Sequence, residues 1–328
     1  MLSKWIKIFS IGLITLLSSS LVVGLIYEQL GRKSAWEENR PHGKTISINQ
    51  TGIHTIIKGK RSQHPTIVFV AGYYPTGATS LIWEKIQEEV SLHTQTISYD
   101  RKGLLWSETP DNKDFSLTST IEELRILINT TAPNQKIILV GHSLSGLLIR
   151  HFAELYPNMV DGLVLIDAPH PNQERIIPKK LLGETGYENY GIWNFLSNVG
   201  YLRSSFNYIY PGTDENASIN TISNAFFPEK VNTILREKEI RRELFEKTLN
   251  QTSLDSLPLK IIFASGKKVQ KEFKERSEGI LFDNLWQELQ RDMLSLSTNS
   301  ELIVADNSGH YIPFEQPDLI INTIVNML

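Results

Sequence analysis

The stretch KIILVGHSLSG, residues 136–146, joins a short apolar run to the start of an amphipathic segment. The apolar run predicts a buried strand, and residues 145–156 predict a helix. Ser143 therefore lies on a sharp turn from strand to helix, where the residues two positions before and after it must be small. Gly141 and Ser145 meet that requirement. The N-terminal amides of the helix would also face any anion that forms beside Ser143.

Strands and helices alternate on both sides of this stretch. Two β-rich runs, residues 45–48 and 53–57, predict a hairpin. Short apolar strands separated by amphipathic helices predict an α/β fold, with a mostly parallel central sheet covered by helices on both faces. The remaining expected strands are 66–70, 94–99, 137–140, 163–166, 259–264 and 302–305, and the expected helices are 81–90, 121–129, 145–156, 285–294 and one from 317.

The alternation is interrupted between residues 170 and 256, in a segment that we call the insertion. It is helical in pattern and rich in aromatic residues: Tyr187, Tyr190, Trp193, Phe195, Tyr201, Phe206, Tyr208, Tyr210, Phe226 and Phe227. We expect a helical lid over the carboxyl edge of the sheet, where open parallel sheets bind ligands. The alternative is an aromatic subdomain that only packs. The core then comprises residues 45–169 and 257–328.

The N-terminal region carries a long apolar run. Residues 8–27 contain no charged side chain and follow Lys4 and Lys7. We expect residues 1–30 to form a transmembrane anchor, which takes about 20 residues, and residues 31–44 to form a linker. A cleaved signal peptide, whose apolar region is usually about 7–15 residues, is the alternative. Lys4 and Lys7 weakly favour a cytoplasmic N-terminus and therefore an extracytoplasmic domain. If the segment is instead a cleaved signal peptide, the domain would be secreted.

Composition limits the classes of partner and cofactor. The chain has 328 residues, 41% of them hydrophobic, and a net charge of −3 from 33 basic and 36 acidic residues. That balance creates no strong field for a polyanion, so nucleic acid is not an expected partner. The absence of cysteine excludes disulfides, thiolate metal sites and a cysteine nucleophile. We see no metal motif or phosphate loop and expect no cofactor; the oligomeric state stays open.

Four segments resemble the α/β-hydrolase family, in the order and sheet positions that the family uses. GHSLSG, 141–146, resembles its nucleophile elbow, with Ser145 where the strict pattern has glycine. VFVAGYYPTGATSLIW, 68–83, resembles a strand, the oxyanion turn and the first helix. YDRKGLLWS, 99–107, is similar to the YDR-x-G-x-G-x-S segment, with Leu105 where glycine is usual. SGHYIPFEQP, 308–317, resembles the segment of the catalytic histidine.

The resemblance implies a serine nucleophile and a histidine base. A serine hydroxyl needs an imidazole to accept its proton and later to protonate the leaving group, so we assign Ser143 as nucleophile and His310 as general base. The backbone N–H groups of Leu144 and Tyr73 are the implied oxyanion hole. We interpret His142 as structural, and His170 as a solvated loop residue that could alternatively line the pocket.

The third member of the triad is less clearly marked. The strand at residues 259–264 is not followed by the Gly-x-x-Asp turn of many members of the family. Asp167 ends the strand at residues 163–166, a position that other members use, and is our assignment. Asp283, in a long loop, is the second candidate, and Asp306 is the third. We expect Asp100 and Arg101 to form a buried ion pair that braces their loop.

These assignments predict a serine hydrolase that cleaves an ester, thioester or amide bond of a small apolar substrate through an acyl-serine intermediate. Serine at the elbow, where epoxide hydrolases and haloalkane dehalogenases have aspartate, argues against those two activities. An iminopeptidase-type peptidase is one alternative. A catalytically silent protein that binds a ligand or partner on the same fold is another. Acyl transfer to an acceptor other than water would share the same intermediate.

Overall fold

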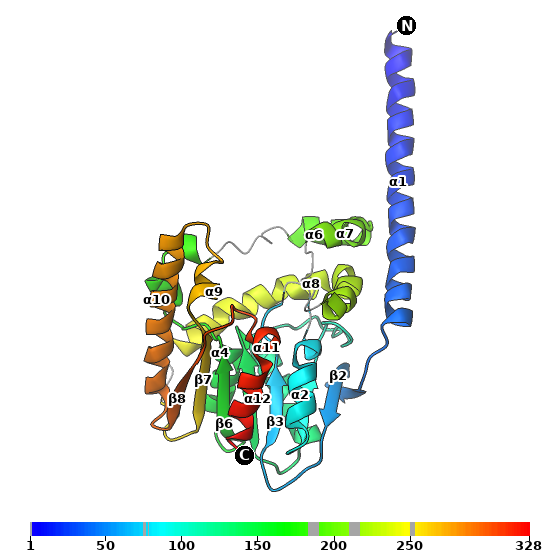
Figure 1. Ribbon diagram of the computed structural model, residues 1–328. Coiled ribbons are helices and arrows are strands. Elements are labelled where there is room, and N and C mark those ends of the chain that lie inside the picture. The colour runs from blue at the N-terminus through cyan, green and yellow to red at the C-terminus, as the bar shows by residue number, and fades with distance from the viewer. Residues whose placement is uncertain (1, 75–76, 78, 183–189, 210–216, 250–252) are drawn as a thin grey trace.

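The computed structural model describes residues 2–74, 77, 79–182, 190–209, 217–249 and 253–328, in which eight strands form one sheet in the order β1-β2-β4-β3-β5-β6-β7-β8 (Figure 1). The first strand pair and the β2–β4 pair are antiparallel, and the other pairs are parallel. The predicted mostly parallel sheet is therefore confirmed. The strands are β1 Lys44–Ile48, β2 Thr51–Lys58, β3 Thr66–Val70, β4 Thr96–Tyr99, β5 Ile137–His142, β6 Val160–Ile166, β7 Leu259–Ala264 and β8 Ser300–Ala305.

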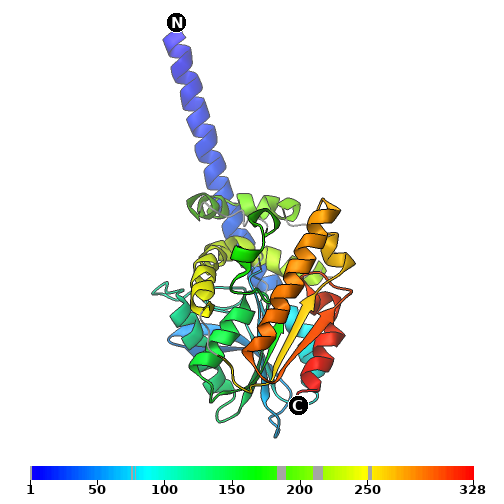
Figure 2. The same cartoon turned by 90° about the vertical axis from the view of Figure 1, so that its left-hand side faces the viewer.

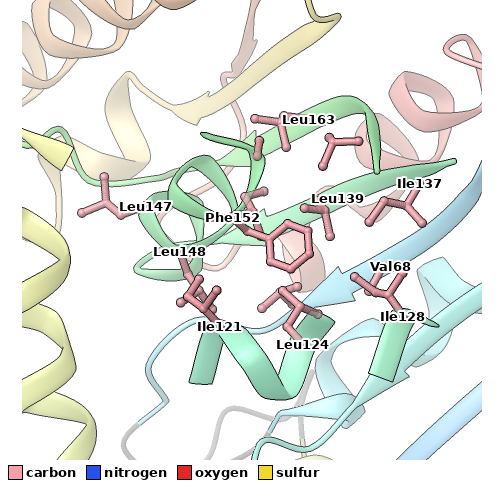
Figure 3. Packing of buried hydrophobic residues seen from close by; sticks show 14 of the residues in the cluster. Val68, Ile121, Leu124, Ile128, Ile137, Leu139, Leu147, Leu148, Phe152 and Leu163 are labelled. Atoms are coloured by element: carbon pink, nitrogen blue, oxygen red, sulfur yellow. The ribbon is translucent and has the colours of Figure 1, made fainter. Parts of the chain in front are cut away.

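Helices cover both faces of the sheet, because alternate strand residues point to opposite sides. Val68 on β3 packs in a cluster with the helices at 117–131 and 145–155, whereas Ile67 and Phe69 pack in a second cluster with the helices at 84–90 and 317–325. Figure 3 shows the first cluster, where Leu124 and Phe152 meet the strands. The core helices are α2 Glu84–Val90, α3 Leu117–Thr131, α4 Ser145–Leu155, α9 Lys267–Gln270, α10 Arg276–Asp292, α11 Ile312–Glu315 and α12 Pro317–Val325.

The described residues of the insertion are mostly helical. Its helices are α5 Gln173–Ile176, α6 Tyr190–Asn198, α7 Tyr201–Ile209 and α8 Ala217–Thr248. The long helix α8 crosses the carboxyl ends of the strands, beneath α6 and α7 (Figures 1 and 2). Tyr187 and Tyr210 lie outside the described residues, as do the side chains of Tyr190, Phe206 and Tyr208.

The N-terminal apolar run forms part of one continuous helix, α1 Leu2–Glu38, which projects from the body (Figure 1). Within it, residues 4–38 form the one helix among the described residues that is long and apolar enough to cross a membrane. The linker expected at residues 31–44 is helical as far as Glu38. The reason is packing: Ala35 is buried in a cluster with Trp106 and Phe226, so this part of the helix belongs to the folded body.

Candidate active site

Ser143 lies directly after β5, at the carboxyl edge of the sheet. Its backbone φ is +54°, a left-handed conformation that is rare for a residue with a side chain, and its N–H donates to the Ile166 carbonyl at 2.8 Å. A side chain on Gly72 would place its Cβ 2.7 Å from the Cβ of Ser143. The backbone of the turn after β3 can therefore approach the serine closely only because residue 72 is glycine.

Ser145 fits the position where the strict elbow motif has glycine. Its hydroxyl lies 2.6 Å from the carbonyl oxygen of Val70 and 2.8 Å from that of His142, so its one hydrogen has two acceptors. The other small position does require glycine, since a Cβ on Gly141 would lie 2.9 Å from the Ser145 carbonyl oxygen. The departure from the strict motif thus adds a buried hydrogen bond without disturbing the turn.

The sheet brings Ser143, His310 and Asp167 together from three loops. Nε2 of His310 lies 3.0 Å from the Ser143 hydroxyl oxygen, and its Nδ1 lies 2.7 Å from Oδ2 of Asp167. Since β5, β6, β7 and β8 are consecutive in a parallel sheet, the loops after β5, β6 and β8 open at the same edge. The serine, the imidazole and the carboxylate form one hydrogen-bonded chain.

The second oxygen of Asp167 is held by two donors. Its Oδ1 accepts the Ala264 backbone N–H at 2.9 Å and the Trp286 indole N–H at 3.0 Å. With His310 on the other oxygen, three donors fix the orientation of this buried carboxylate. Trp286 lies on α10, more than a hundred residues along the chain, and no motif in the sequence marks it as a partner of Asp167.

The charge environment raises the pKa of His310. Burial of the ring lowers this pKa, but the hydrogen bond and the charge of Asp167 outweigh it, with smaller contributions from Glu272 and Glu315. The pKa is therefore above the ordinary value of 6.5. A basic imidazole whose Nδ1–H points at a carboxylate leaves Nε2 free to accept a proton from Ser143.

His142 supports the backbone of His310. Its Nε2 lies 2.8 Å from the His310 carbonyl oxygen, so Nε2 carries the hydrogen, and its Nδ1 accepts the Tyr74 hydroxyl at 3.0 Å. Burial, together with the charge of His310, lowers the pKa of His142 to about 3. The ring is therefore neutral at physiological pH and has the structural environment that the sequence suggests.

The other acid candidates lie in different surroundings. Asp283 accepts hydrogen bonds from the Ser265 hydroxyl and the Gln270 amide, both at 2.8 Å, and so orders the turn after β7. Asp306 is exposed and accepts from the side chain of Asn307. The carboxylate beside the imidazole is that of Asp167.

Two sequence interpretations at other positions are wrong. His170 is not solvated: it is buried, its Nδ1 accepts the Asn172 N–H, and its Nε2 donates to Asp292 at 3.0 Å. Asp100 and Arg101 do not pair with each other either. Asp100 lies 2.8 Å from Nδ1 of His54, because neighbouring residues at the end of a strand point in opposite directions.

Arg101 instead joins the insertion to the turn after β3. Its guanidinium pairs with Glu237 on α8, with Nε to Oε1 at 2.6 Å. The same group donates to the carbonyl oxygens of Ala71 and Gly72, directly before Tyr73. This buried pair therefore fixes the backbone from which the expected Tyr73 N–H donor would point.

A small cavity of about 20 Å³ lies beside the elbow. It is lined by Leu144 and Tyr73, whose backbone N–H groups form the expected oxyanion hole. Its other walls are mainly apolar and include Leu148 on α4 with Ile240 and Leu244 on α8. The insertion thus closes an apolar space next to the elbow residues Leu144 and Ser145, and that space holds about one water molecule in this arrangement. Across the described residues, no cluster of three or more His, Asp or Glu side chains is arranged to hold a metal ion.

Comparisons with known proteins agree with this architecture. A family model described as alpha/beta hydrolase fold matches residues 65–190. The uncharacterized protein YqjL of Bacillus subtilis (strain 168) is 24% identical over 291 residues, which cover 88% of this chain and 90% of YqjL. Epoxide hydrolase 1 of Caenorhabditis elegans is 28% identical over 131 residues, 40% of this chain and 31% of that protein. A mutant of an epoxide hydrolase from Bacillus megaterium superimposes with a TM-score of 0.64 at 18% identity, over 87% of this chain and 99% of the enzyme.

Proposed function

Because the chain belongs to the α/β-hydrolase fold family, we propose that it is a serine hydrolase that cleaves an ester, thioester or amide bond through an acyl-Ser143 intermediate. The observation that carries the proposal is the hydrogen-bonded chain from Ser143 through His310 to Asp167, with distances of 3.0 and 2.7 Å. A hydroxyl, a basic imidazole and a buried carboxylate in that order activate a serine.

In the proposed reaction, His310 takes the hydroxyl proton at Nε2 while the Ser143 oxygen attacks the substrate carbonyl. The negative charge of the tetrahedral intermediate is stabilised by the N–H groups of Leu144 and Tyr73 and by the N-terminal end of α4. The imidazolium then protonates the leaving group, and the acyl-enzyme forms. A water molecule, deprotonated by the same imidazole, attacks the acyl-enzyme and releases the acid.

The structural similarity to epoxide hydrolases does not bring their substrate to this chain. A carboxylate that opens an epoxide forms an ester, which water can hydrolyse. A serine hydroxyl that opened the same ring would form an alkyl ether, which water does not cleave, so the enzyme would stop after one turnover. Serine at position 143 supports a carbonyl substrate, where the covalent intermediate is a hydrolysable ester.

Three departures from the family pattern favour a catalytically silent protein: the position of the acid, Ser145 and Leu105. Each has a compensating contact. The unusual position of the acid still brings a carboxylate to His310. Ser145 makes a buried hydrogen bond. Leu105, where glycine is usual, adopts a φ of +40° and is buried in an apolar cluster, so packing offsets its backbone strain. We therefore retain hydrolysis as the proposal over silent binding.

The apolar walls of the cavity favour a small apolar acyl group, and the test is a substrate series. We expect the full chain in mild detergent to hydrolyse p-nitrophenyl esters. Because the space beneath α8 is small, kcat/KM should be highest for short acyl chains and should fall as the acyl chain lengthens. The protein with Ser143→Ala is the control. Tight, saturable ester binding without turnover in the unmodified chain would contradict hydrolysis and favour a binding protein. Turnover of N-terminal prolyl peptides in preference to esters would favour an iminopeptidase.

The raised pKa of His310 predicts the pH profile. The imidazole must be neutral to accept the serine proton, so kcat/KM is high above its pKa and falls as the pH drops through it. Because the pKa lies above its ordinary value of 6.5, we expect the acidic limb to have its inflection above pH 6.5. A pH–rate series with an uncharged ester measures this directly, and an inflection well below that pH would contradict the proposed Asp167–His310 pair.

We also propose that α1 anchors the protein in a membrane, with the folded body on the extracytoplasmic side. The support is the length and apolar composition of residues 4–38 and the two lysines that precede residue 8. Cleavage of a signal peptide with release of the body is the alternative. Detection of the intact N-terminal peptide by mass spectrometry of the membrane fraction distinguishes the two.

A further inference from the structure

The lower half of α1 packs closely on the turn between α6 and α7. A Cβ on Gly24 would overlap the carbonyl oxygen of Val199, and a Cβ on Gly200 would lie 2.9 Å from the carbonyl oxygen of Gly24. Gly200 also has a φ of +73°. The helix and the turn can approach this closely only because both positions are glycine, so their relative depth is fixed at this point.

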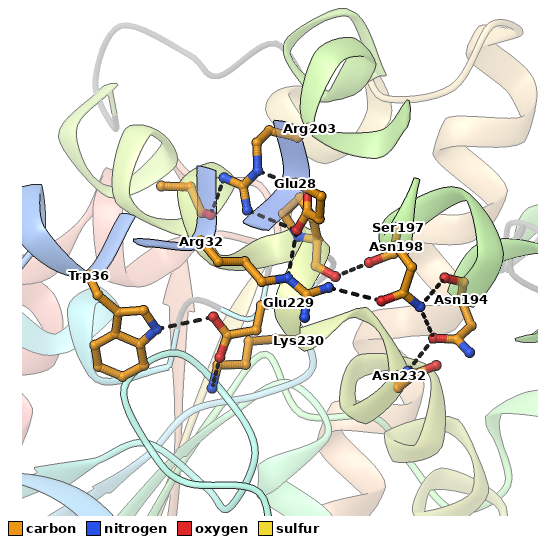
Figure 4. Close-up of polar contacts among 12 residues, drawn as sticks. Glu28, Arg32, Trp36, Asn194, Ser197, Asn198, Arg203, Glu229, Lys230 and Asn232 are labelled. Atoms are coloured by element: carbon orange, nitrogen blue, oxygen red, sulfur yellow. Dashed lines mark hydrogen bonds and ion pairs between the residues drawn. The ribbon is translucent and has the colours of Figure 1, made fainter. Parts of the chain in front are cut away.

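A buried ion cluster holds the same contact one turn farther along α1 (Figure 4). Glu28 is fully buried, and its carboxylate pairs with Arg203 on α7 at 2.9 Å and with Arg32 at 2.8 Å. Arg32 also donates to the side chain of Asn198 at the end of α6. Removing one partner of a buried ion pair leaves an uncompensated charge, so such pairs fix register more than they add stability.

The contact continues toward the end of the helix. Trp36 donates its indole N–H to Glu229 on α8 at 3.1 Å and packs edge-on against Phe226, with ring centroids 5.0 Å apart. Residues 24–36 of α1 are therefore packed against the insertion. Residues 8–23, by contrast, are exposed and contain no charged side chain.

This division of α1 indicates where the membrane boundary lies along the helix. Twenty helical residues span about 30 Å, which is the thickness of the hydrocarbon core. If the uncharged residues 8–27 fill that core, Gly24, the first residue that contacts the insertion, lies within the last helical turn before the membrane boundary, and the turn at Val199 and Gly200 lies beside it. Figures 1 and 2 agree with this placement, since α6 and α7 lie at the end of the body from which α1 projects, and the C-terminus lies at the opposite end.

Helix α6 carries apolar side chains on two faces. Trp193 and Leu196 pack inward on the cluster that includes Phe227 of α8. Ile192 and Phe195, three residues apart, are 54% and 57% exposed, and Tyr201 at the start of α7 is 54% exposed. Three large exposed apolar or aromatic side chains beside one turn are unfavourable in water, whereas isoleucine and phenylalanine can bury in the lipid boundary and tyrosine suits the membrane–water interface.

We propose that Ile192, Phe195 and Tyr201 form a lipid-contacting patch that rests on the membrane surface that α1 enters. This inference depends on the membrane anchoring proposed above. The glycine contact and the Glu28 cluster set the height of the patch, and the anchor keeps it against the lipid. The insertion, which closes the cavity beside Leu144 and Ser145, is thereby held at the bilayer surface.

The chain contains no cysteine, so one substitution provides a unique site for a fluorescent label. Full-length protein carrying Ile192→Cys or Phe195→Cys is labelled with an environment-sensitive dye and reconstituted in phosphatidylcholine vesicles with or without nitroxide-bearing lipid. Leu16→Cys reports on α1 itself. Leu92→Cys is the matched control, because Leu92 is 77% exposed and precedes β4, at the opposite edge of the sheet.

We expect nitroxide lipid to quench the labels at 16, 192 and 195 at least twofold more than the label at 92. Quenching at 16 with labels at 192 and 195 that behave like the one at 92 overturns the lipid-contacting patch and leaves the anchor intact. Unquenched labels at all positions overturn both. In the Phe195→Cys background, Glu28→Gln should reduce quenching, whereas Glu37→Gln should not, because Glu37 is exposed and outside the cluster. Equal quenching in the Glu28→Gln and Glu37→Gln variants contradicts the role of the Glu28 cluster.

Discussion

Replacement of Ser143 by alanine is expected to lower kcat for ester hydrolysis by about 10⁴-fold to 10⁶-fold, with little change in melting temperature. The substitution removes the only atom that can form the acyl-enzyme, while it keeps the Cβ that the turn already accommodates at a φ of +54°. The residual rate would come from substrate binding and from the backbone donors alone. Steady-state kinetics and thermal unfolding of the two proteins measure the two quantities.

Ser145 provides the matched control for this substitution. It lies two residues away on the same turn, and its hydroxyl faces the carbonyl oxygens of Val70 and His142. We expect Ser145→Ala to keep kcat within about tenfold and to cost about 1 kcal/mol of stability, the usual net contribution of one hydrogen bond. If Ser143→Ala retained activity comparable with that of Ser145→Ala, Ser143 would not be the nucleophile.

Replacement of Asp167 by asparagine is expected to lower kcat by about 10⁴-fold, because it forces the wrong tautomer on His310. The Oδ1 site of Asp167 faces two donors, the N–H of Ala264 and the indole N–H of Trp286, so the oxygen of the new amide occupies that position. The amide NH₂ then points at Nδ1 of His310, which must accept, and the ring hydrogen moves to Nε2. An imidazole protonated at Nε2 cannot accept the serine proton.

The pH profile separates this electrostatic role from a structural one. Without the carboxylate, the largest contributions that raise the pKa of His310 are lost, so the acidic limb of any residual activity should move to lower pH. Asp283→Asn is the control, because Asp283 orders the turn after β7. We expect that variant to lose stability and to keep the acidic limb. A large shift of the acidic limb in Asp283→Asn, with none in Asp167→Asn, would identify Asp283 rather than Asp167 as the carboxylate that acts on His310.

The sheet and the elbow are predictable from the sequence because both depend on local patterns. Alternating apolar runs report the strands, and the small residues around Ser143 report a strained turn. Helix limits were harder to predict: the helix expected from residue 121 begins at Leu117, because the Ser116 hydroxyl accepts the Ser119 N–H and caps it. The loops that carry Ser143, Asp167 and His310 converge as a consequence of strand order.

The features that the sequence does not reveal are contacts between distant segments. Trp286 reaches Asp167 from α10, and Glu237 reaches Arg101 from the insertion. The docking of α1 is another such contact, since Glu28 appears in the sequence only as the end of an apolar run and needs Arg203 to become buried. No periodicity connects residues this far apart, so tertiary packing alone determines these pairs.

The docking of α1 affects the choice of protein for assays. A soluble fragment that begins at Arg40 lacks Glu28, Arg32 and Trp36, all of which contact the insertion. The loss of α1 would expose Arg203 and the apolar cluster that contains Phe226. The full chain in detergent or vesicles is therefore the material on which the proposed activity should be judged.

If Ser143 is an activated nucleophile, it should react covalently with a fluorophosphonate. Full-length protein is treated with a fluorophosphonate and digested, and the modified residue is identified by mass spectrometry, with His310→Ala as a second sample. We expect one phosphonylated serine, Ser143, and greatly slowed labelling in His310→Ala. The absence of an adduct at Ser143 in folded protein, or labelling that is independent of His310, would contradict the assignment of Ser143 as the activated nucleophile.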